Sequence, residues 1–294
     1  MPAGGHDFVP PVAVYGDNCI DRYVVPNLQD FVGGNAVNVA IHLVAQGATV
    51  AYFGVTGDDL EGELVRRALV EHGIDCTHLD VREGETAVTW IEVHQGERFV
   101  MGDKAGVQCP LSLSPEGLTA LAKYKVVHCP AFTAWNVSLG QAQPYLPKEI
   151  RYLAQNGVFV SVDFSELERS ELAMVAGADI GVAFISRGPK CSDDVLLRTF
   201  DFFRGYGIPQ VVITLGSDGA AFIEEGELTR LPSRSAAVVD TLGAGDAFIA
   251  GWLYGWLTGD GPRQRMLRAI ERAGSACEVW GAWPQPAQSG QPQR

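Results

Sequence analysis

The chain has 294 residues, of which 47% are hydrophobic and 19% charged, with a net charge of −13. These numbers allow one large α/β domain or two modest ones, and they exclude a disordered or fibrous chain. The negative charge would repel a polyanion such as DNA, and no local Lys/Arg cluster overrides it, so we expect no nucleic-acid partner.

The N-terminus, residues 1–11, lacks a basic segment followed by an apolar stretch, so it does not resemble a signal peptide. The longest apolar run, residues 247–257, is well short of the roughly 18–20 residues that a bilayer-spanning helix needs. We therefore expect a soluble, cytoplasmic protein with no membrane partner.

The first third of the chain alternates short apolar runs with amphipathic segments that end at glycine. Residues 11–16 and 48–53 are predicted strands, and residues 35–46 and 59–72 are predicted helices closed by Gly47 and Gly73. Residues 86–93 and 98–101 flank Gln95-Gly96 and predict a hairpin. Its apolar residues fall on both faces, which fits either a sheet covered on both sides or a loosely patterned edge hairpin.

Alternation of strands and helices continues through the rest of the chain. It predicts a doubly wound, mostly parallel sheet with helices on both faces, in a single domain over residues 1–284 with a β lid at about 86–103. Residues 285–294 are rich in Pro and Gln and predict a disordered tail. The further predicted strands are 126–129, 158–163, 180–185, 210–215, 220–224 and 228–231, and the further helices are 114–124, 192–204, 247–257 and 264–280.

Residues 238–248, VVDTLGAGDAF, join an apolar strand to a very apolar helix through a turn of small residues. Gly243, Ala244 and Gly245 would present free backbone N–H groups at a helix N-terminus, which is a favourable site for an anion. Asp246 follows directly, so a carboxylate would stand beside a bound phosphoryl group. This pattern predicts phosphoryl transfer with Asp246 as the general base, and proton transfer that is late or concerted with phosphoryl transfer.

The string Asp-Thr-Leu-Gly-Ala-Gly-Asp at residues 240–246 resembles the signature of the ribokinase/PfkB carbohydrate kinases. A second stretch, Gly33-Gly34-Asn35-Ala36-Val37-Asn38, resembles the family's first motif, a Gly-Gly pair that opens a helix. Two glycines let the backbone approach a polyhydroxy substrate, and Asn35 and Asn38 lie one turn apart. The resemblance covers about residues 12–283 and implies a ribokinase-like fold.

The resemblance also implies roles for other positions. Asp21 would bind sugar hydroxyls with Asp17 assisting, although the two residues alone fit ordinary turn positions. The stretch Thr-Leu-Gly-Ser-Asp-Gly at 214–219 resembles the family's ATP-binding turn. The implied ATP-binding residues are Thr214, Gly216, Gly219, Gly274 and Cys277.

The chain departs from the family at residues 186–189, Ser-Arg-Gly-Pro, where many members have an Asn-x-x-Glu that helps to organise Mg²⁺. ATP and Mg²⁺ are still implied, with a monovalent cation such as K⁺ left open, but no metal-ligating residue is assigned.

The motifs look most like the fructoselysine 6-kinase branch, which implies a fructosamine substrate. The lid residues Thr86, Trp90 and Arg98 and the stretch 131–136 would line the variable part of the pocket, and a homodimer through the lid is the expected assembly. Trp90 and Trp135 fit either stacking on a sugar or core packing. Kinases for fructose, ribose, ketodeoxygluconate or nucleosides, and a non-catalytic sugar or nucleotide sensor, stay open. A dinucleotide oxidoreductase is disfavoured, because residues 16–21 supply no Gly-x-Gly-x-x-Gly.

Overall fold

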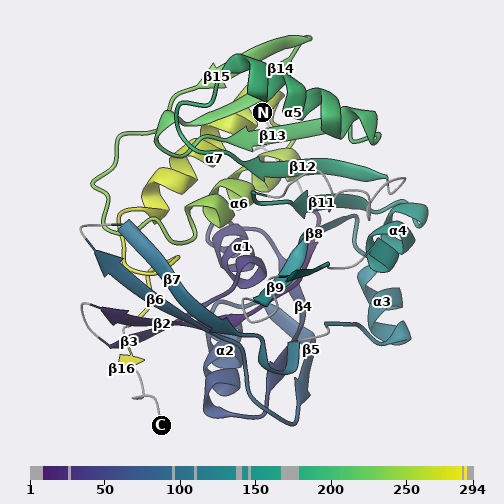
Figure 1. Ribbon diagram of the computed structural model, residues 1–294. Coiled ribbons are helices and arrows are strands. Elements are labelled where there is room, and N and C mark those ends of the chain that lie inside the picture. Colours follow the sequence, from purple (N-terminus) through teal and green to yellow (C-terminus); the bar gives the residue numbers. More distant parts are fainter. Residues whose placement is uncertain are drawn as a thin grey trace, which may run out of the picture.

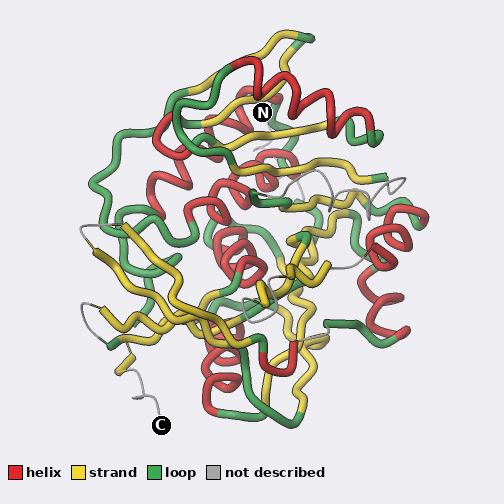
Figure 2. The backbone as a smooth tube through the Cα atoms, viewed as in Figure 1, coloured by secondary structure: helices red, strands yellow, loops and turns green. Residues whose placement is uncertain are grey.

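The computed structural model describes residues 9–25, 28–94, 97–108, 111–136, 141–144, 147–166, 179–286 and 288–289. Its centre is a nine-stranded sheet (Figures 1 and 2) in which all strands from β5 to β13 in the spatial order are parallel, while β14 pairs antiparallel with both β13 and β15. In spatial order the strands are β15 (Glu227–Leu231), β14 (Ala220–Glu224), β13 (Gln210–Thr214), β12 (Ile180–Ser186), β11 (Phe159–Asp163), β8 (Val126–Pro130), β1 (Val12–Tyr15), β4 (Val50–Gly57) and β5 (Asp75–Arg82).

Helices cover both faces of this sheet, as the alternation in sequence predicts. Along β1, Val12 and Val14 belong to one buried cluster, whereas Ala13 and Tyr15 belong to the other. Successive side chains of a strand point to opposite faces, so each face needs its own apolar cover. One face is covered by α1 (Asn35–Val44), α2 (Leu60–Glu71), α6 (Ala244–Leu257) and α7 (Pro262–Ala276), and the other by α3 (Pro115–Leu121), α4 (Pro147–Gln155) and α5 (Asp193–Gly205).

A smaller five-stranded sheet lies beside the first and forms the lid. The predicted hairpin is present as β6 (Val88–His94) and β7 (Glu97–Lys104), and β6 also pairs in parallel with β2 (Cys19–Val25). The order continues through β3 (Gln29–Gly33) to β16 (Gln288–Ser289). The mixed apolar pattern of β6 is explained by cover on both faces: Val88 packs on the main core, and Ile91 packs with Tyr23 and Phe31.

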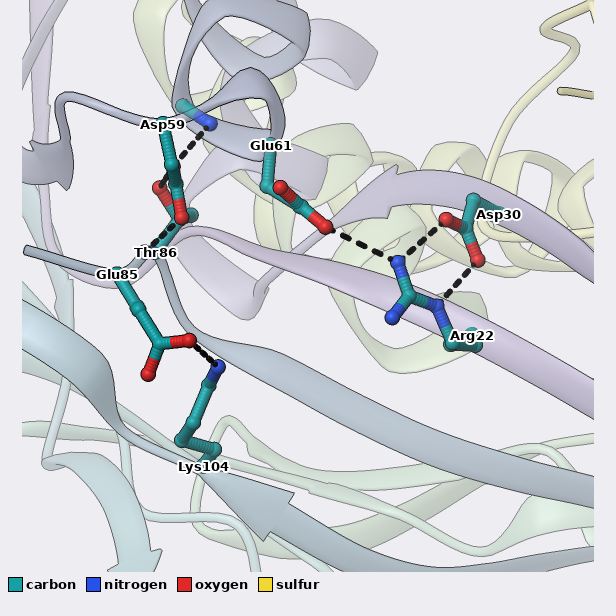
Figure 3. Close-up of polar contacts among 8 residues, drawn as sticks. Arg22, Asp30, Asp59, Glu61, Glu85, Thr86 and Lys104 are labelled. Carbon is teal, nitrogen blue, oxygen red and sulfur yellow. Dashed lines mark hydrogen bonds and ion pairs between the residues drawn. The ribbon is translucent and has the colours of Figure 1, made fainter. Parts of the chain in front are cut away.

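Polar contacts hold the lid against α2 (Figure 3). Arg22 of β2 binds Asp30 of β3 through two hydrogen bonds of 2.8 and 2.7 Å and also contacts Glu61 of α2. Asp59, the residue that caps α2, accepts hydrogen bonds from the backbone and hydroxyl of Thr86. Because Arg22 and Asp30 are both buried, loss of Arg22 would leave the charge of Asp30 unpaired inside the protein, whereas loss of Asp30 would leave Arg22 with Glu61 alone.

Several elements differ from the sequence predictions. Strands β2, β3 and β5 and helix α4 were not predicted, nor was the two-stranded sheet of β9 (Phe132–Asn136) and β10 (Gln141–Pro144). In the described part of the predicted disordered tail, Gln285 exchanges hydrogen bonds with the backbone of Val32, and β16 pairs with the edge of β3. The disorder of the tail stays a prediction. None of the helices in the described ranges combines the length and apolar character that a membrane crossing requires.

Candidate active site

The turn that opens α6 leads from a long loop into an almost wholly apolar helix. Gly243 is the N-cap and has a φ of 72°, in the left-handed region that favours glycine. A Cβ at this position would lie 2.4 Å from the Cβ of Ala282, so any side chain would disturb the turn. The backbone shape of the turn therefore depends on glycine at this residue.

The backbone donors of this turn are left open. Within the described residues, the N–H groups of Gly243 and Gly245 have no hydrogen-bond partner, and no side chain caps the helix. Gly245 is exposed, and a Cβ built on it would meet no atom within 4 Å. Free donors at a helix N-terminus next to open space are suited to hold a phosphoryl group.

Asp246 lies directly behind this turn and is held by Asn38 of α1. The carboxylate accepts a 2.8 Å hydrogen bond from the Asn38 amide nitrogen, and the residue is 7% exposed. Trp283 donates its indole N–H to the Asn38 side-chain oxygen at 3.2 Å. An indole can only donate, so this contact fixes the orientation of the Asn38 amide with its nitrogen toward Asp246.

Asn38 is 2% exposed, and its described bonds go to Asp246 and Trp283, so its packing fits a residue that positions the Asp246 carboxylate. The predicted part of Asn38 in sugar binding stays a prediction.

A second carboxylate of the motif, Asp240, fixes the turn from the other side. It is 2% exposed and accepts hydrogen bonds from the Tyr23 hydroxyl of the lid and from the backbone of Leu242 and Gly281. The backbone of Asp240 is in turn bonded to the carbonyl of Cys277 at the end of α7. The turn is thus joined to both the lid and α7.

The entrance to α1 is the second glycine turn of the site. Gly34 has a φ of 102°, and the helix has no cap of its own. Asp17 supplies one: its carboxylate accepts hydrogen bonds from the N–H groups of Asn35 at 2.9 Å and Ala36 at 3.1 Å. Burial raises the pKa of Asp17 to about 6 against the lowering effect of these N–H groups. The contacts of Asp17 are those of a cap, and its predicted part in sugar binding stays a prediction. The half-exposed side chain of Asn35 has no described partner.

Asp21 lies over the other glycine of the pair. A Cβ on Gly33 would fall 1.9 Å from a carboxylate oxygen of Asp21, so glycine here makes room for that carboxylate. Asp21 is buried, and the Cys19 thiol donates to it at 3.4 Å. The two predicted sugar-binding elements, Asp21 and the Gly33-Gly34 pair, are therefore in contact.

Comparison with known proteins identifies the family to which the chain belongs. The model described as "pfkB family carbohydrate kinase" matches residues 21–282, nearly the whole chain.

The chain belongs to the pfkB family of carbohydrate kinases.

Relatives and solved structures agree with this assignment. The fructoselysine 6-kinase of Escherichia coli (strain K12) is 33% identical over 273 residues, which cover 92% of this chain and 99% of the relative. The fructosamine kinase FrlD of Bacillus subtilis (strain 168) is 27% identical over 276 residues, or 91% of each chain. The fold is that of Arabidopsis thaliana ribokinase complexed with ribose and ATP, with a TM-score of 0.76, 20% identity and coverage of 94% of this chain and 95% of that one. The ribokinase-like fold predicted from the sequence is confirmed.

The predicted nucleotide-binding residues of this pfkB kinase lie along one edge of the large sheet. Thr214 ends β13, and its hydroxyl lies 3.2 Å from that of Ser186 at the end of β12. Gly216 and Gly219 have φ angles of 56° and 94° in the short 3₁₀ turn that follows, Gly216–Asp218. The carboxyl ends of parallel strands are where ligands bind in this class of fold, so the placement agrees with the predicted role.

The two predicted residues of α7 have protein neighbours. A Cβ on Gly274 would lie 2.9 Å from the side chain of Arg234, which is paired with Glu271 and Glu278. Cys277 contributes its carbonyl to the α6 turn, and burial raises the pKa of its thiol. Their proximity to adenine stays a prediction.

Of the predicted pocket residues in the lid, two pack against other parts of the protein. Thr86 is fully buried against Asp59, and Trp90 packs on the main core, which is the core-packing alternative for Trp90. The sequence pattern does not show that this face of the lid rests on α2, and the part of Thr86 and Trp90 in a sugar pocket stays a prediction. The side chains of Arg98 and Trp135 lie outside the described residues, and only the backbone pairing of Arg98 with Val93 is described.

The residues missed by the sequence reasoning are those that hold the turn, Tyr23 and Trp283, and a cation at the nucleotide edge, Arg187. Its backbone N–H donates to the Thr214 carbonyl, and its guanidinium donates to the Ser186 carbonyl. It follows β12 where many family members have Asn-x-x-Glu. Within the described ranges, no three His, Cys, Asp or Glu side chains form a metal site.

Proposed function

We propose that this carbohydrate kinase transfers the γ-phosphoryl group of ATP to the 6-hydroxyl of a fructosamine such as fructoselysine. The observation that carries the substrate is the 33% identity to two fructoselysine 6-kinases, from Escherichia coli and Shigella flexneri, over 99% of their length. A fructosamine kinase from Bacillus subtilis points to the same class of substrate.

In this proposal each residue around the α6 turn has a separate role in phosphoryl transfer. The open N–H groups of Gly243 and Gly245 stabilise charge on the transferring phosphoryl group, which ATP supplies when bound. Asp246 accepts the proton of the attacking hydroxyl as the bond to phosphorus forms. Asn38 aims the carboxylate, and Asp21 with Asn35 orients the hydroxyls of the sugar.

The backbone N–H groups of the α6 turn are suited to bind a phosphate, not a metal ion. The turn offers backbone N–H groups, whereas the described residues lack a cluster of metal ligands. We infer that Mg²⁺ would be carried mainly by phosphate oxygens and water, as this ion commonly is in nucleotide sites. Arg187, at the edge next to Thr214, would add positive charge near the phosphates.

A coupled ADP-release assay across fructoselysine, fructose, ribose, ketodeoxygluconate and adenosine tests the proposal. We expect kcat/KM for fructoselysine to exceed that for the others by at least tenfold, and the product to carry phosphate on its 6-hydroxyl. Runs with and without Mg²⁺ and K⁺ test the expected ion requirements. Preference for an unmodified sugar would contradict the substrate, and absence of ADP release with every acceptor would contradict the activity.

We also propose a homodimer formed through the lid. Strand β7 is the outer strand of the lid sheet, and Phe99, Val100 and Met101 on it are exposed by 46%, 56% and 59%. Light scattering after size exclusion tests this, with Val100→Glu expected to give a monomer. A monomeric wild-type protein at micromolar concentration would contradict the dimer.

A further inference from the structure

A row of polar side chains crosses the face of the lid that carries Asp21. In the register of the lid sheet, Asp21 of β2 is opposite Thr89 of β6, and Thr89 is opposite Asp103 of β7. Residues directly opposite one another in neighbouring strands point to the same face of a sheet. The contact of the Thr89 hydroxyl with Cys19, two residues before Asp21, agrees with this orientation.

This face of the lid is the one directed at the catalytic residues. Tyr23, two residues after Asp21 on the same face, binds Asp240 of the α6 turn, and with Ile91 and Phe31 it packs against Leu242. The other face rests on the main core and on α2 through Val88 and Arg22. Strand β7 also lies beside β9, which follows β8 at the carboxyl edge of the large sheet. Asp103 is therefore at the outer end of the row, on the strand that lies beside β9.

One carboxylate oxygen of Asp103 is buried and has no hydrogen-bond partner among the residues that the structure describes. Burial accordingly raises the pKa of Asp103. Of the lid cations whose side chains are described, Arg22 points to the other face and is bound to Asp30, and Lys104, the next residue along β7, pairs with Glu85. A carboxylate without a donor is costly to bury, and Asp103 is still half-exposed, so a donor supplied by a ligand at its accessible side would be favoured.

We propose that Asp103 binds the positively charged amine of the substrate and thereby selects fructosamines over neutral sugars. The inference rests on the proposed function and deepens it. Neighbouring strands are 4.7–4.9 Å apart, so Asp21 and Asp103, two strands apart, are separated by about 10 Å along the sheet. A ketose whose hydroxyls lie at Asp21 and whose C1 amine extends along the row would bring its ammonium group to Asp103. An ammonium group there would add the attraction of opposite charges to the hydrogen bond, which a neutral hydroxyl cannot do.

The test compares wild type and Asp103→Asn with 1-amino-1-deoxyfructose, its neutral N-acetyl derivative, and fructose. Loss of a hydrogen bond to a charged group predicts a rise in KM for the amine of roughly 10- to 100-fold, with kcat nearly unchanged. We expect KM for fructose and for the N-acetyl derivative to change by less than about threefold. Asp201→Asn, at an exposed position of α5, is the matched control and should change none of these constants.

Calorimetric binding of 1-amino-1-deoxyfructose without ATP separates this inference from the proposed activity. Tighter binding of the amine than of fructose by wild type, lost in Asp103→Asn, supports the role of Asp103 even if no phosphorylation is detected. Equal weakening of the amine and of fructose in the variant would overturn it, as would an unchanged preference for the amine. Thermal melts of both variants establish that each is folded.

Discussion

Two helices of the site begin in the same way, yet their N-termini are used differently. Both α1 and α6 start at a glycine with positive φ, Gly34 and Gly243, and neither has a capping side chain of its own. At α1 the free N–H groups are taken up by the carboxylate of Asp17. At α6 the N–H groups of Gly243 and Gly245 have no partner among the described residues.

The difference is that the N-terminus of α1 is bound within the protein, whereas the N-terminus of α6 can still bind a ligand. An N-terminus filled by an internal carboxylate is fixed and offers nothing more to an anion, whereas an open one keeps its donors for a ligand. The acid at α6, Asp246, lies within the helix and is aimed by Asn38, so it does not close the turn.

The largest effect is expected from Asp246→Asn. An amide has nearly the same shape and can still accept from Asn38, but it cannot take the proton of the attacking hydroxyl. We expect kcat to fall by about 10²-fold or more, with the KM for sugar changed by less than about threefold. Initial rates of ADP release measure this, with Asp201→Asn as the control. A loss smaller than about tenfold would show that Asp246 is not the base.

A smaller but more specific effect is expected from Gly245→Ala. The new methyl group would enter open space and replace glycine in a helix, so stability should rise by up to about 1 kcal/mol. The same methyl group would occupy the space next to the donors, and we expect kcat to fall by about 10- to 100-fold. Gly205→Ala in the last turn of α5 also meets open space and should leave kcat unchanged. Full activity of Gly245→Ala would mean that no phosphoryl group approaches this turn.

Tyr23→Phe tests whether the lid helps to hold the open turn. The change removes one hydrogen bond to the buried carboxylate of Asp240, which also holds the backbone of Leu242. We expect a loss of about 1–3 kcal/mol in the free energy of unfolding and a fall in kcat of about tenfold. Urea denaturation and steady-state rates measure the two effects, with the half-exposed Tyr206→Phe as the control. A loss of stability with unchanged kcat would confine Tyr23 to a structural role.

The smallest effect is expected from titration of the filled N-terminus. The pKa of Asp17 is about 6 in the folded protein, above its ordinary 3.8, so its contribution to stability is full below pH 3.8 and falls as the pH rises through 6. The difference between the folded and the ordinary pKa of Asp17 corresponds to roughly 3 kcal/mol of free energy. The unfolding free energy of wild type minus that of Asp17→Asn should therefore fall by about 2 kcal/mol between pH 4.5 and 7.5. A difference that rises with pH would contradict the raised pKa.

The sequence predicted the parts of the fold and site that depend on local signals. Apolar runs and glycine stops predicted β1, α1 and α2, and the motif at residues 240–246 predicted the open turn. Strand β5 was missed because its sequence, DCTHLDVR, is polar and half exposed at the edge of the sheet. Strands β2 and β3 were missed because Arg22 and Asp30 read as surface residues, whereas in the fold they neutralise each other.

The partners of site residues could not be predicted, because they come from distant parts of the chain. Asn38 and Trp283 are 245 residues apart, and Tyr23 and Asp240 are 217 apart. The sequence placed Asn38 and Asp17 near the predicted site, but only the structure shows that Asn38 contacts Asp246 across the packing of α1 against α6 and that Asp17 caps α1. Asp103 gives no signal in sequence, because its place in the row depends on strand register.

The most direct test of the central claim is the amide resonance of Gly245 in ¹⁵N-glycine-labelled protein, assigned by its absence in Gly245→Ala. ADP, Mg²⁺, aluminium fluoride and fructoselysine together mimic the transferring phosphoryl group. If the Gly245 N–H donates to the phosphoryl group, its proton resonance should shift strongly downfield on addition of this mixture. The resonance of Gly226, in the turn between β14 and β15, should not shift. An unchanged Gly245 resonance in a complex whose formation is verified by calorimetry would contradict the account.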